Sequence, residues 1–287
     1  MKIAVIGADG QLGSDLMRAL EGDEVVPLFY PEFDVTRPER VRSVFRDLRP
    51  ETVINTAAFH RVDECEDNPE SAFRVNAIAV RDLALLADDL GFVLVHFSTD
   101  YVFDGRKRAP YVESDPPNPL NVYAVSKLAG EFFVRALVKR HFLIRTCGLF
   151  GESSSREKGY NFVDRMIALA EEGRTIRVVN DQWVSPTASA ELAERTAELI
   201  RTDQYGLYHL TSEGQCTWYQ FAREIFVLLG RSPRLEPVDS KSYGAKARRP
   251  LYSVLENKRA KEVGLRDFSA WNEALRVYLG KKGLIPR

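Results

Sequence analysis

The chain has 287 residues, of which 45% are hydrophobic and 28% are charged, enough to bury the core of one or two domains. Its net charge of −1 provides no strong field for a polyanion, so we expect no nucleic-acid partner. Three scattered cysteines without a CxxC pair argue against disulfides and zinc, and the lack of any membrane-length apolar run favours a cytoplasmic protein without membrane association.

Short apolar strands alternate with helical stretches in the first half of the chain. Strands are predicted at 2–6, 24–29, 52–55, 92–98 and 141–145. Helical periodicity occupies the stretches 11–21, 37–48, 69–90 and 121–139. Thr36 and Glu39 predict a capping box at the start of the second helix. This alternation predicts an α/β fold, a Rossmann-type doubly wound parallel sheet with helices on both faces.

The second half is less regular. We expect residues 1–150 to form the first domain, joined by elements from about 180–205, and residues 151–287 to form mainly a smaller, mixed α/β lobe interleaved with it. The stretch 151–159 is polar and is predicted to be a loop. Thr187 is predicted to cap a helix that ends near residue 201. Other helices are predicted at 161–172, 217–229 and 268–279.

Three glycines, Gly7, Gly10 and Gly13, follow the first strand directly and open the first helix. Glycines allow a tight turn and a close approach of the backbone to a pyrophosphate, which the helix N-terminus attracts. The order GxxGxxG resembles that of short-chain dehydrogenase/reductases. The first domain is therefore predicted to bind a dinucleotide, and the second lobe is predicted to bind the substrate.

The choice between NADPH and NADH stays open. The second strand ends at Phe29 without the carboxylate that would bind a ribose 2′-hydroxyl and repel a 2′-phosphate. NADPH is therefore permitted, with Arg37 either a phosphate partner or a solvated residue at a helix start. Asp34 comes later and is placed to reach the adenine.

A tyrosine and a lysine, Tyr123 and Lys127, are spaced to share one helix face, and Thr99 ends the strand upstream. We predict that Tyr123 protonates a reduced carbonyl, that Lys127 holds the nicotinamide ribose and lowers the tyrosine pKa, and that Thr99 orients the carbonyl oxygen. Spacing alone is weak support, because Tyr278 and Lys282 repeat it where we expect only a surface helix end.

Three other positions lie near this predicted site. The small residues at Ala57 and Ala58 would let a coenzyme pass close to the end of the third strand. Asn76, a poor helix former, either supports the backbone of the site or the lysine, or is merely tolerated. His60 either faces the site or is a structural or surface residue.

Several further segments join these motifs: TAA at 56–58, STDYVFDG at 98–105, PLNVY at 119–123, KLAGE at 127–131, SPT at 185–187, GLYHL at 206–210 and RRP at 248–250. The set resembles the dTDP-4-dehydrorhamnose reductase family of extended short-chain dehydrogenase/reductases over nearly the whole chain. The resemblance implies NAD(P)H-dependent reduction of the C4 ketone of dTDP-4-dehydro-β-L-rhamnose to dTDP-β-L-rhamnose.

The resemblance also implies roles for single residues. Together with Gly7 and Gly13 of the glycine turn, the implied coenzyme contacts are Gly10, Gln11, Leu12, Asp34, Val35, Ala57, Ala58, Tyr123 and Lys127. Thr99 and Asp100 would contact the sugar. Arg249 would contact the diphosphate or be an ordinary surface residue. A homodimer is among the expected assemblies.

This chain departs from the family pattern at several positions. Gly148 stands where some members place a tryptophan against the sugar, and His60 stands where a threonine tunes the site. Some members bind Mg²⁺ between subunits through acidic side chains. Asp15 and Ala190 replace two of these acids here, so we predict no metal site.

Two other functions fit the same scaffold. A nucleotide-sugar epimerase would retain NAD and show no net coenzyme turnover. The regulatory β subunit of methionine adenosyltransferase resembles this family and acts mainly through binding. The intact set of Thr99, Tyr123 and Lys127 favours a catalytic role over a purely regulatory one.

Overall fold

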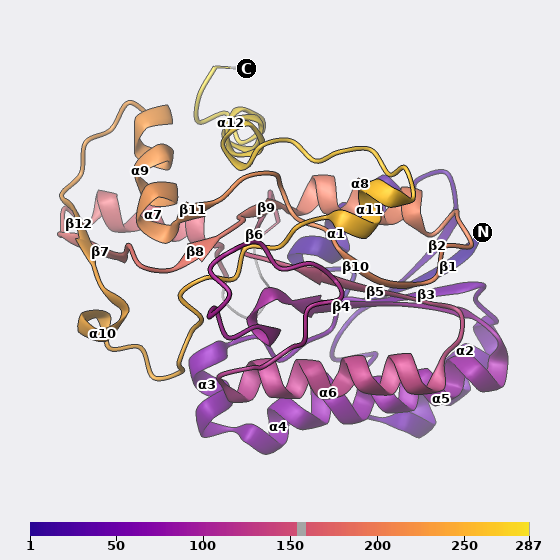
Figure 1. Cartoon of the computed structure of the whole chain (residues 1–287). Coiled ribbons are helices and arrows are strands. Elements are labelled where there is room, and N and C mark those ends of the chain that lie inside the picture. Colours follow the sequence, from indigo (N-terminus) through magenta and orange to yellow (C-terminus); the bar gives the residue numbers. More distant parts are fainter. Residues whose placement is uncertain (154–158, 287) are drawn as a thin grey trace.

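A six-stranded parallel sheet forms the centre of the molecule in the computed structural model, which describes residues 1–153 and 159–286 (Figure 1). Its order is β10-β5-β4-β3-β1-β2, with bounds β10 Gly206–His209, β5 His141–Thr146, β4 Val93–Thr99, β3 Thr52–Asn55, β1 Lys2–Ile6 and β2 Glu24–Leu28. All five strand pairings are parallel. The predicted Rossmann-type sheet is confirmed: the ends of its five predicted strands differ from the prediction by one residue at most, and the sixth strand, β10, was not predicted.

Helices cover both faces of this sheet (Figure 1). One face packs against α2 (Pro38–Leu48), α5 (Ala79–Leu90) and α6 (Val122–Leu137), and the other against α1 (Gln11–Ala19) and α8 (Ser189–Leu199). Each face has its own buried apolar cluster, as a sheet covered on both sides requires. Between β3 and α6 the chain also forms α3 (Val62–Asp67) and a short 3₁₀ turn, Asp100–Val102.

The single helix predicted over 69–90 is interrupted. Its segments are α4 (Pro69–Phe73), a π-helical turn (Arg74–Ile78) and α5. Asn76 lies fully buried in the π-helical turn, and its amide bonds to both backbone groups of Phe59 at 2.9 Å. Such turns are frequent at functional sites. Asn76 therefore supports the backbone at Phe59, which is one of the alternatives predicted for it.

Beyond residue 150 the chain builds a third apolar core, whose largest contributions come from α7 (Phe162–Glu171), α9 (Trp218–Leu228) and α12 (Trp271–Lys281). Thr217 caps α9 with a capping box. Smaller elements complete this half: β6 (Leu149–Phe150), β7 (Ile176–Val179), β8 (Trp183–Val184), β9 (Thr187–Ala188), β11 (Cys216–Thr217), β12 (Leu235–Val238), α10 (Ser240–Tyr243) and α11 (Lys258–Glu262). The strands pair as β6–β9, β8–β11 and β7–β12.

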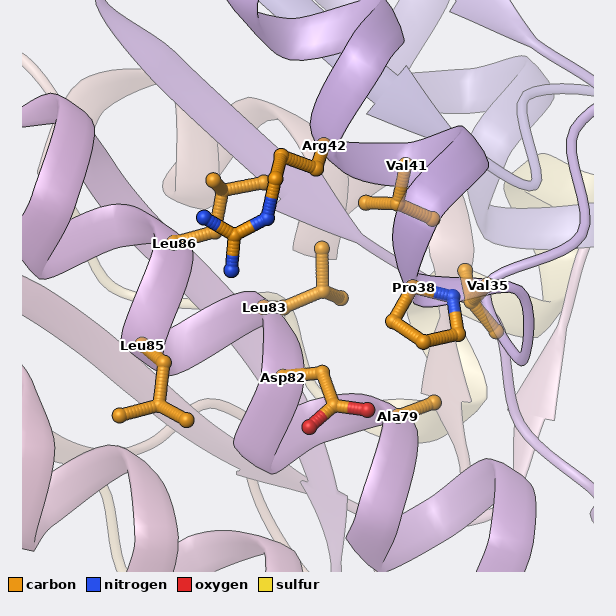
Figure 2. Close-up of a pocket in the computed structure, with 9 residues that line it drawn as sticks. All are labelled: Val35, Pro38, Val41, Arg42, Ala79, Asp82, Leu83, Leu85 and Leu86. Atoms are coloured by element: carbon orange, nitrogen blue, oxygen red, sulfur yellow. The ribbon is translucent and has the colours of Figure 1, made fainter.

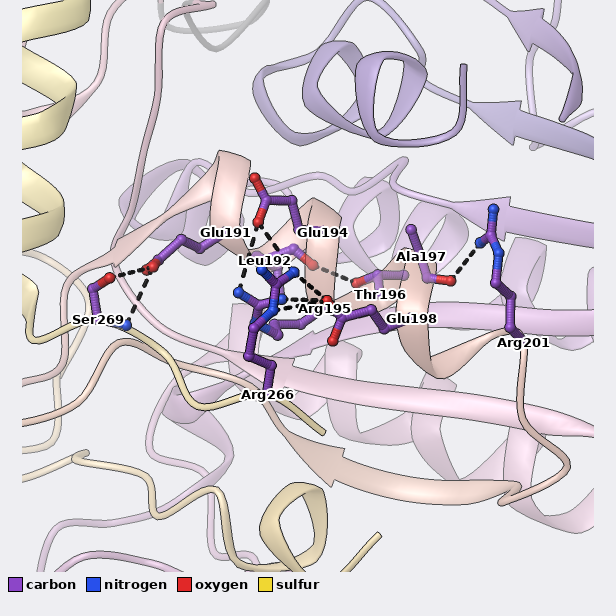
Figure 3. Close-up of polar contacts among 10 residues, drawn as sticks. All are labelled: Glu191, Leu192, Glu194, Arg195, Thr196, Ala197, Glu198, Arg201, Arg266 and Ser269. Carbon is purple, nitrogen blue, oxygen red and sulfur yellow. Dashed lines mark hydrogen bonds and ion pairs between the residues drawn. The ribbon is translucent and has the colours of Figure 1, made fainter. Parts of the chain in front are cut away.

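Polar contacts fasten α8 to the segment that leads into α12 (Figure 3). The carboxylate of Glu191 accepts from the backbone amide of Ser269 at 3.2 Å and from its hydroxyl at 2.5 Å. Glu198 accepts from Arg195 and from Arg266. Since α8 also packs on α1, it joins the main sheet to the third core.

Two predicted caps are wrong because each hydroxyl finds a closer partner. Arg37, not Thr36, precedes α2, and the Thr36 amide and hydroxyl both donate to Asp34, at 2.9 and 2.7 Å. Thr187 lies in β9 and donates to the Ser185 carbonyl at 2.9 Å, so α8 starts without a side-chain cap.

The surface location predicted for Tyr278 is also wrong. Its ring is 4% exposed within the third core. Its hydroxyl accepts from Asn161 and donates to Asp164, each at 3.1 Å, and Lys282 donates to Asp164 at 2.6 Å. Tyr278 and Lys282 therefore form a structural contact inside the second half of the chain.

Most of the loop predicted at 151–159 falls on residues 154–158, outside the described residues. Among the helices that the structure describes, none has the length and apolar character to cross a membrane.

A buried ion pair ties α6 to the sheet. Arg145 on β5 donates to Glu131 on α6 at 2.9 and 2.6 Å, and the two side chains are 1% and 0% exposed. The guanidinium lies over the Phe103 ring, 5.1 Å from its centroid. Because neither charge reaches water, each depends on the other.

We predict that Glu131→Leu lowers the free energy of unfolding by about 3–5 kcal/mol, because it leaves the Arg145 charge buried without a partner. Denaturant unfolding measures the change. Glu171→Leu is the control: it breaks the exposed Arg231–Glu171 pair and is expected to cost no more than about 1 kcal/mol. Equal losses in the two variants would contradict the prediction.

Candidate active site

The glycine turn lies between β1 and α1 and meets the geometric needs of a phosphate site. Gly7 has φ +75°, and its amide donates to the Leu28 carbonyl at 2.9 Å. Gly10 precedes α1 without a side-chain cap, so the N–H groups of the first turn keep their capacity for a ligand. A Cβ on Gly13 would lie 2.1 Å from the Gly7 carbonyl oxygen. The turn therefore fits a dinucleotide, with Gln11 and Leu12 in the first helical turn.

The end of β2 offers no carboxylate. Phe29 and Tyr30 are 41% and 60% exposed there. Asp34 holds the turn that follows through Thr36, and Arg37 lies 3.6 Å from its carboxylate with the side chain 74% exposed. Arg37 is thus accessible to a phosphate, while Asp34 already has partners.

Val35 and the end of β3 occupy different environments. Val35 is 7% exposed and lines a hollow between α2 and α5 together with Leu83 and Val41 (Figure 2). Ala57 and Ala58 are half-buried at the carboxyl end of β3. The Ala57 amide donates to the Asn55 side chain at 3.1 Å, which fixes this strand end.

Thr99 and Tyr123 meet at the carboxyl end of β4. The Thr99 hydroxyl donates to Asp100 at 3.1 Å, and Tyr123 packs edge-on to Tyr101 with ring centroids 6.3 Å apart. Burial raises the pKa of the Tyr123 phenol, and a hydrogen bond with the Thr99 hydroxyl opposes that rise. Asn121 caps α6 by accepting from the Ala124 amide at 2.8 Å, and so sets where the tyrosine helix begins.

Lys127 follows one turn later and is 3% exposed. Its ammonium donates to the Phe97 carbonyl at 2.6 Å, and burial lowers its pKa to about 8. The lysine does not contribute to the pKa shift of Tyr123, which is upward. The expectation that Lys127 lowers the tyrosine pKa is therefore not met, because the ammonium is bonded to the Phe97 carbonyl of β4.

Asp100 is a buried carboxyl group beside Thr99. Burial raises its pKa to about 6, an effect opposed by donors that include Cys147 and Thr99. The Cys147 thiol donates to it at 3.1 Å. No sequence pattern predicted that Cys147 reaches the site, because it follows β5 and comes 47 residues after Asp100 in the chain.

Arg249 lies against α3. Both its terminal nitrogens donate to Asp63, at 3.0 and 2.9 Å, and its side chain is 20% exposed. It also interacts with Tyr101, next to the Tyr123 ring. Arg249 is therefore near the candidate site, and a diphosphate would share it with Asp63.

Trp218 fills the space beside Gly148. Gly148 has φ +52°, and a Cβ there would meet the Trp218 indole at 3.0 Å. The indole also packs on Phe162, with ring centroids 4.7 Å apart. An indole thus reaches this edge of the site from the first turn of α9. The sequence analysis missed Trp218, because no local pattern links residues so far apart in the chain.

The two remaining positions have structural partners. His60 is half-buried, and its Nδ1 lies 3.4 Å from the Ala58 carbonyl. Asp15 forms an ion pair with Arg18 and accepts from the Ser189 hydroxyl at 2.5 Å. Asp15 therefore ties α1 to α8.

Comparison with known proteins agrees with this arrangement. The RmlD substrate binding domain family matches residues 1–283. dTDP-4-dehydrorhamnose reductase from Burkholderia thailandensis is 39% identical over 91% of this chain and 92% of its own, and dTDP-4-keto-6-deoxy-D-glucose reductase from Streptomyces niveus is 40% identical over 94% of both.

A solved structure is similar throughout. The dTDP-4-dehydrorhamnose reductase from Bacillus anthracis in complex with NADP superimposes with a TM-score of 0.93 at 36% identity, covering 98% of this chain and 100% of its own. These matches cover both the glycine turn and the region of Thr99, Tyr123 and Lys127. The chain belongs to the dTDP-4-dehydrorhamnose reductase family, a family of oxidoreductases.

Proposed function

We propose that this protein reduces the C4 ketone of dTDP-4-dehydro-β-L-rhamnose to dTDP-β-L-rhamnose with NADPH or NADH. The observation that carries the proposal is the meeting of Thr99, Tyr123 and Lys127 at the carboxyl edge of a parallel sheet, where ligands of this fold bind. The family membership and the glycine turn support a nicotinamide coenzyme.

The bound coenzyme supplies the hydride, and the chain supplies the proton. Tyr123 donates its phenolic proton to the oxygen of the reduced carbonyl. This phenol is protonated at neutral pH, as a proton donor must be, although burial raises its pKa away from the near-neutral value that favours proton transfer. Thr99 orients the same oxygen through its hydroxyl.

In this proposal Lys127 binds the coenzyme. A buried ammonium is costly, and its lowered pKa is the signature of that cost. A costly charged group in a ligand-binding region is a functional candidate. In the proposal Lys127 turns from the Phe97 carbonyl to the nicotinamide ribose.

The nucleotide end of the substrate is assigned to residues 151–287 and to Arg249. Residues 1–150, with α8 and β10, form the coenzyme-binding domain in this proposal. Asp100 binds the sugar beside Thr99, and Trp218 lines the edge that Gly148 leaves open. A homodimer belongs to the proposal as well, and light scattering of the purified protein tests it.

A second candidate substrate follows from the Streptomyces niveus relative, whose name indicates the keto sugar of the gluco series. dTDP-4-keto-6-deoxy-D-glucose presents the same C4 ketone between carbons of opposite configuration, C3 with its hydroxyl and C5 with its methyl group. Both substrates use the same residues of the chain. The difference lies in the sugar contacts of Asp100 and Trp218.

We expect net oxidation of NADPH or NADH when dTDP-4-dehydrorhamnose is supplied. The loss of absorbance of the reduced coenzyme measures this oxidation. dTDP-4-keto-6-deoxy-D-glucose in a parallel assay tests the second substrate. An epimerase would convert its substrate without net coenzyme turnover. No oxidation of either coenzyme with either sugar would reject the reductase function.

Tyr123→Phe is expected to lower turnover by about 100-fold or more while coenzyme affinity stays within a few fold, because only the transferred proton is removed. Steady-state kinetics and coenzyme titration measure the two quantities. Tyr278→Phe is the matched control, since Tyr278 has the same spacing to a lysine but lies in the third core. Similar losses of turnover in both variants would remove Tyr123 from its role.

Lys127→Met is expected to raise the free energy of unfolding by roughly 1–3 kcal/mol at pH 7, although coenzyme affinity falls. The lysine pKa in the folded protein is about 8, below its usual value. The cost of the ammonium is therefore present in full below pH 8, and it disappears as the pH rises toward the unfolded-state value. Denaturant unfolding at a series of pH values from 7 upward measures the effect. The gain in unfolding free energy of Lys127→Met over the wild type should become smaller as the pH rises.

Lys241→Met, at an exposed helix position, is the control and should show no such gain. A destabilised Lys127→Met protein at pH 7 would contradict the assigned cost of the buried ammonium.

A further inference from the structure

His96 is a fully buried histidine that none of the roles above uses. It lies on β4 with 0% of its surface exposed. Its Nδ1 is 3.3 Å from the Asn55 amide nitrogen, and its Nε2 is 3.5 Å from the Lys127 Nζ. Burial, reinforced by Lys127, holds the His96 pKa well below its usual value, so the ring is neutral.

The neighbours of His96 determine which ring nitrogen carries the proton. The Asn55 oxygen accepts from the Ala57 amide at 3.1 Å, so the NH₂ group of Asn55 must face the ring. An NH₂ group only donates, which makes Nδ1 the acceptor. The single proton of the neutral ring is then on Nε2, the nitrogen that faces Lys127.

An N–H group aimed at an amine favours its neutral form and disfavours the ammonium. Two neighbours oppose this. The Phe97 carbonyl on β4 accepts from the Lys127 ammonium at 2.6 Å, a bond that the neutral amine can also donate. Glu131, one turn along α6, favours the ammonium, but its carboxylate is paired with Arg145. Asn55 on β3 carries no charge, and Tyr123 is a neutral phenol near pH 7.

We propose that His96 is a positioning residue of the site: Asn55 fixes its proton on Nε2, and this N–H eases the loss of a proton from Lys127. The inference rests on the proposed coenzyme role of Lys127. It gives the lysine access to both amine and ammonium near neutral pH.

The wild-type protein tests the tautomer directly. The chain has four histidines, so ¹⁵N labelling of histidine gives a simple spectrum, in which His96→Gln identifies the His96 signals. The ring nitrogens of His96 are expected to report a proton on Nε2 alone over roughly pH 6–9. A proton on Nδ1, or a ring that titrates in this range, would overturn the proposal whether or not the variant folds.

A second measurement follows Lys127 itself. Its side-chain NMR signal, assigned with Lys127→Met, is titrated with pH in the wild type and in His96→Gln. The glutamine oxygen can accept from the ammonium, so the midpoint is expected to rise by about one pH unit. His141→Gln, which changes a half-buried histidine at the start of β5, should leave the midpoint unchanged.

An unchanged midpoint in His96→Gln would overturn the proposal. NADPH affinity is measured over the same pH range and should decline at the alkaline end about one pH unit later in His96→Gln than in the wild type. If the wild type bound no coenzyme, the proposed function would fail, while the NMR result would still decide what His96 does to Lys127.

Discussion

The ion pair between Arg145 and Glu131 is the constraint on which the site depends. It joins α6 to β5 in a place that water does not reach. The pair therefore fixes how α6 is turned about its own axis and how closely α6 packs on the sheet. Lys127 lies one turn before Glu131 on that helix, and Tyr123 one turn before Lys127. The placement of both candidate side chains at the carboxyl end of β4 therefore follows from a contact that has no role in the proposed reaction.

Several polar groups of the site are held at a cost to folding. Lys127 is buried against a carbonyl, Asp100 is a carboxyl group out of water, and His96 is a neutral ring inside the sheet. Each has partners on strands or helices that are distant in the chain. Those partners hold the groups still before any ligand arrives, which is how a site avoids reorganisation during a reaction.

The two halves of the chain share the site. α8 and β10 come late in the chain but belong to the main sheet and its helical layer. Arg249 and Trp218 come from the second half and reach the region of Tyr101 and Gly148. In the proposed function, specificity for a sugar would depend on contacts between the halves, whereas the glycine turn is built within the first half, between β1 and α1 and against Leu28 of β2.

The parallel sheet, the glycine turn and the spacing of Tyr123 and Lys127 could all be predicted from the sequence, because alternation, glycine order and helical periodicity are local properties. The sequence did not reveal the direction of the Tyr123 pKa shift, the burial of Tyr278, or the partners of Thr36 and Thr187. The pairing of Arg249 with Asp63 and the contact of His96 with Lys127 were equally hidden. These features are visible only in the folded protein, because burial and charge pairing depend on residues that folding brings together from separate parts of the chain.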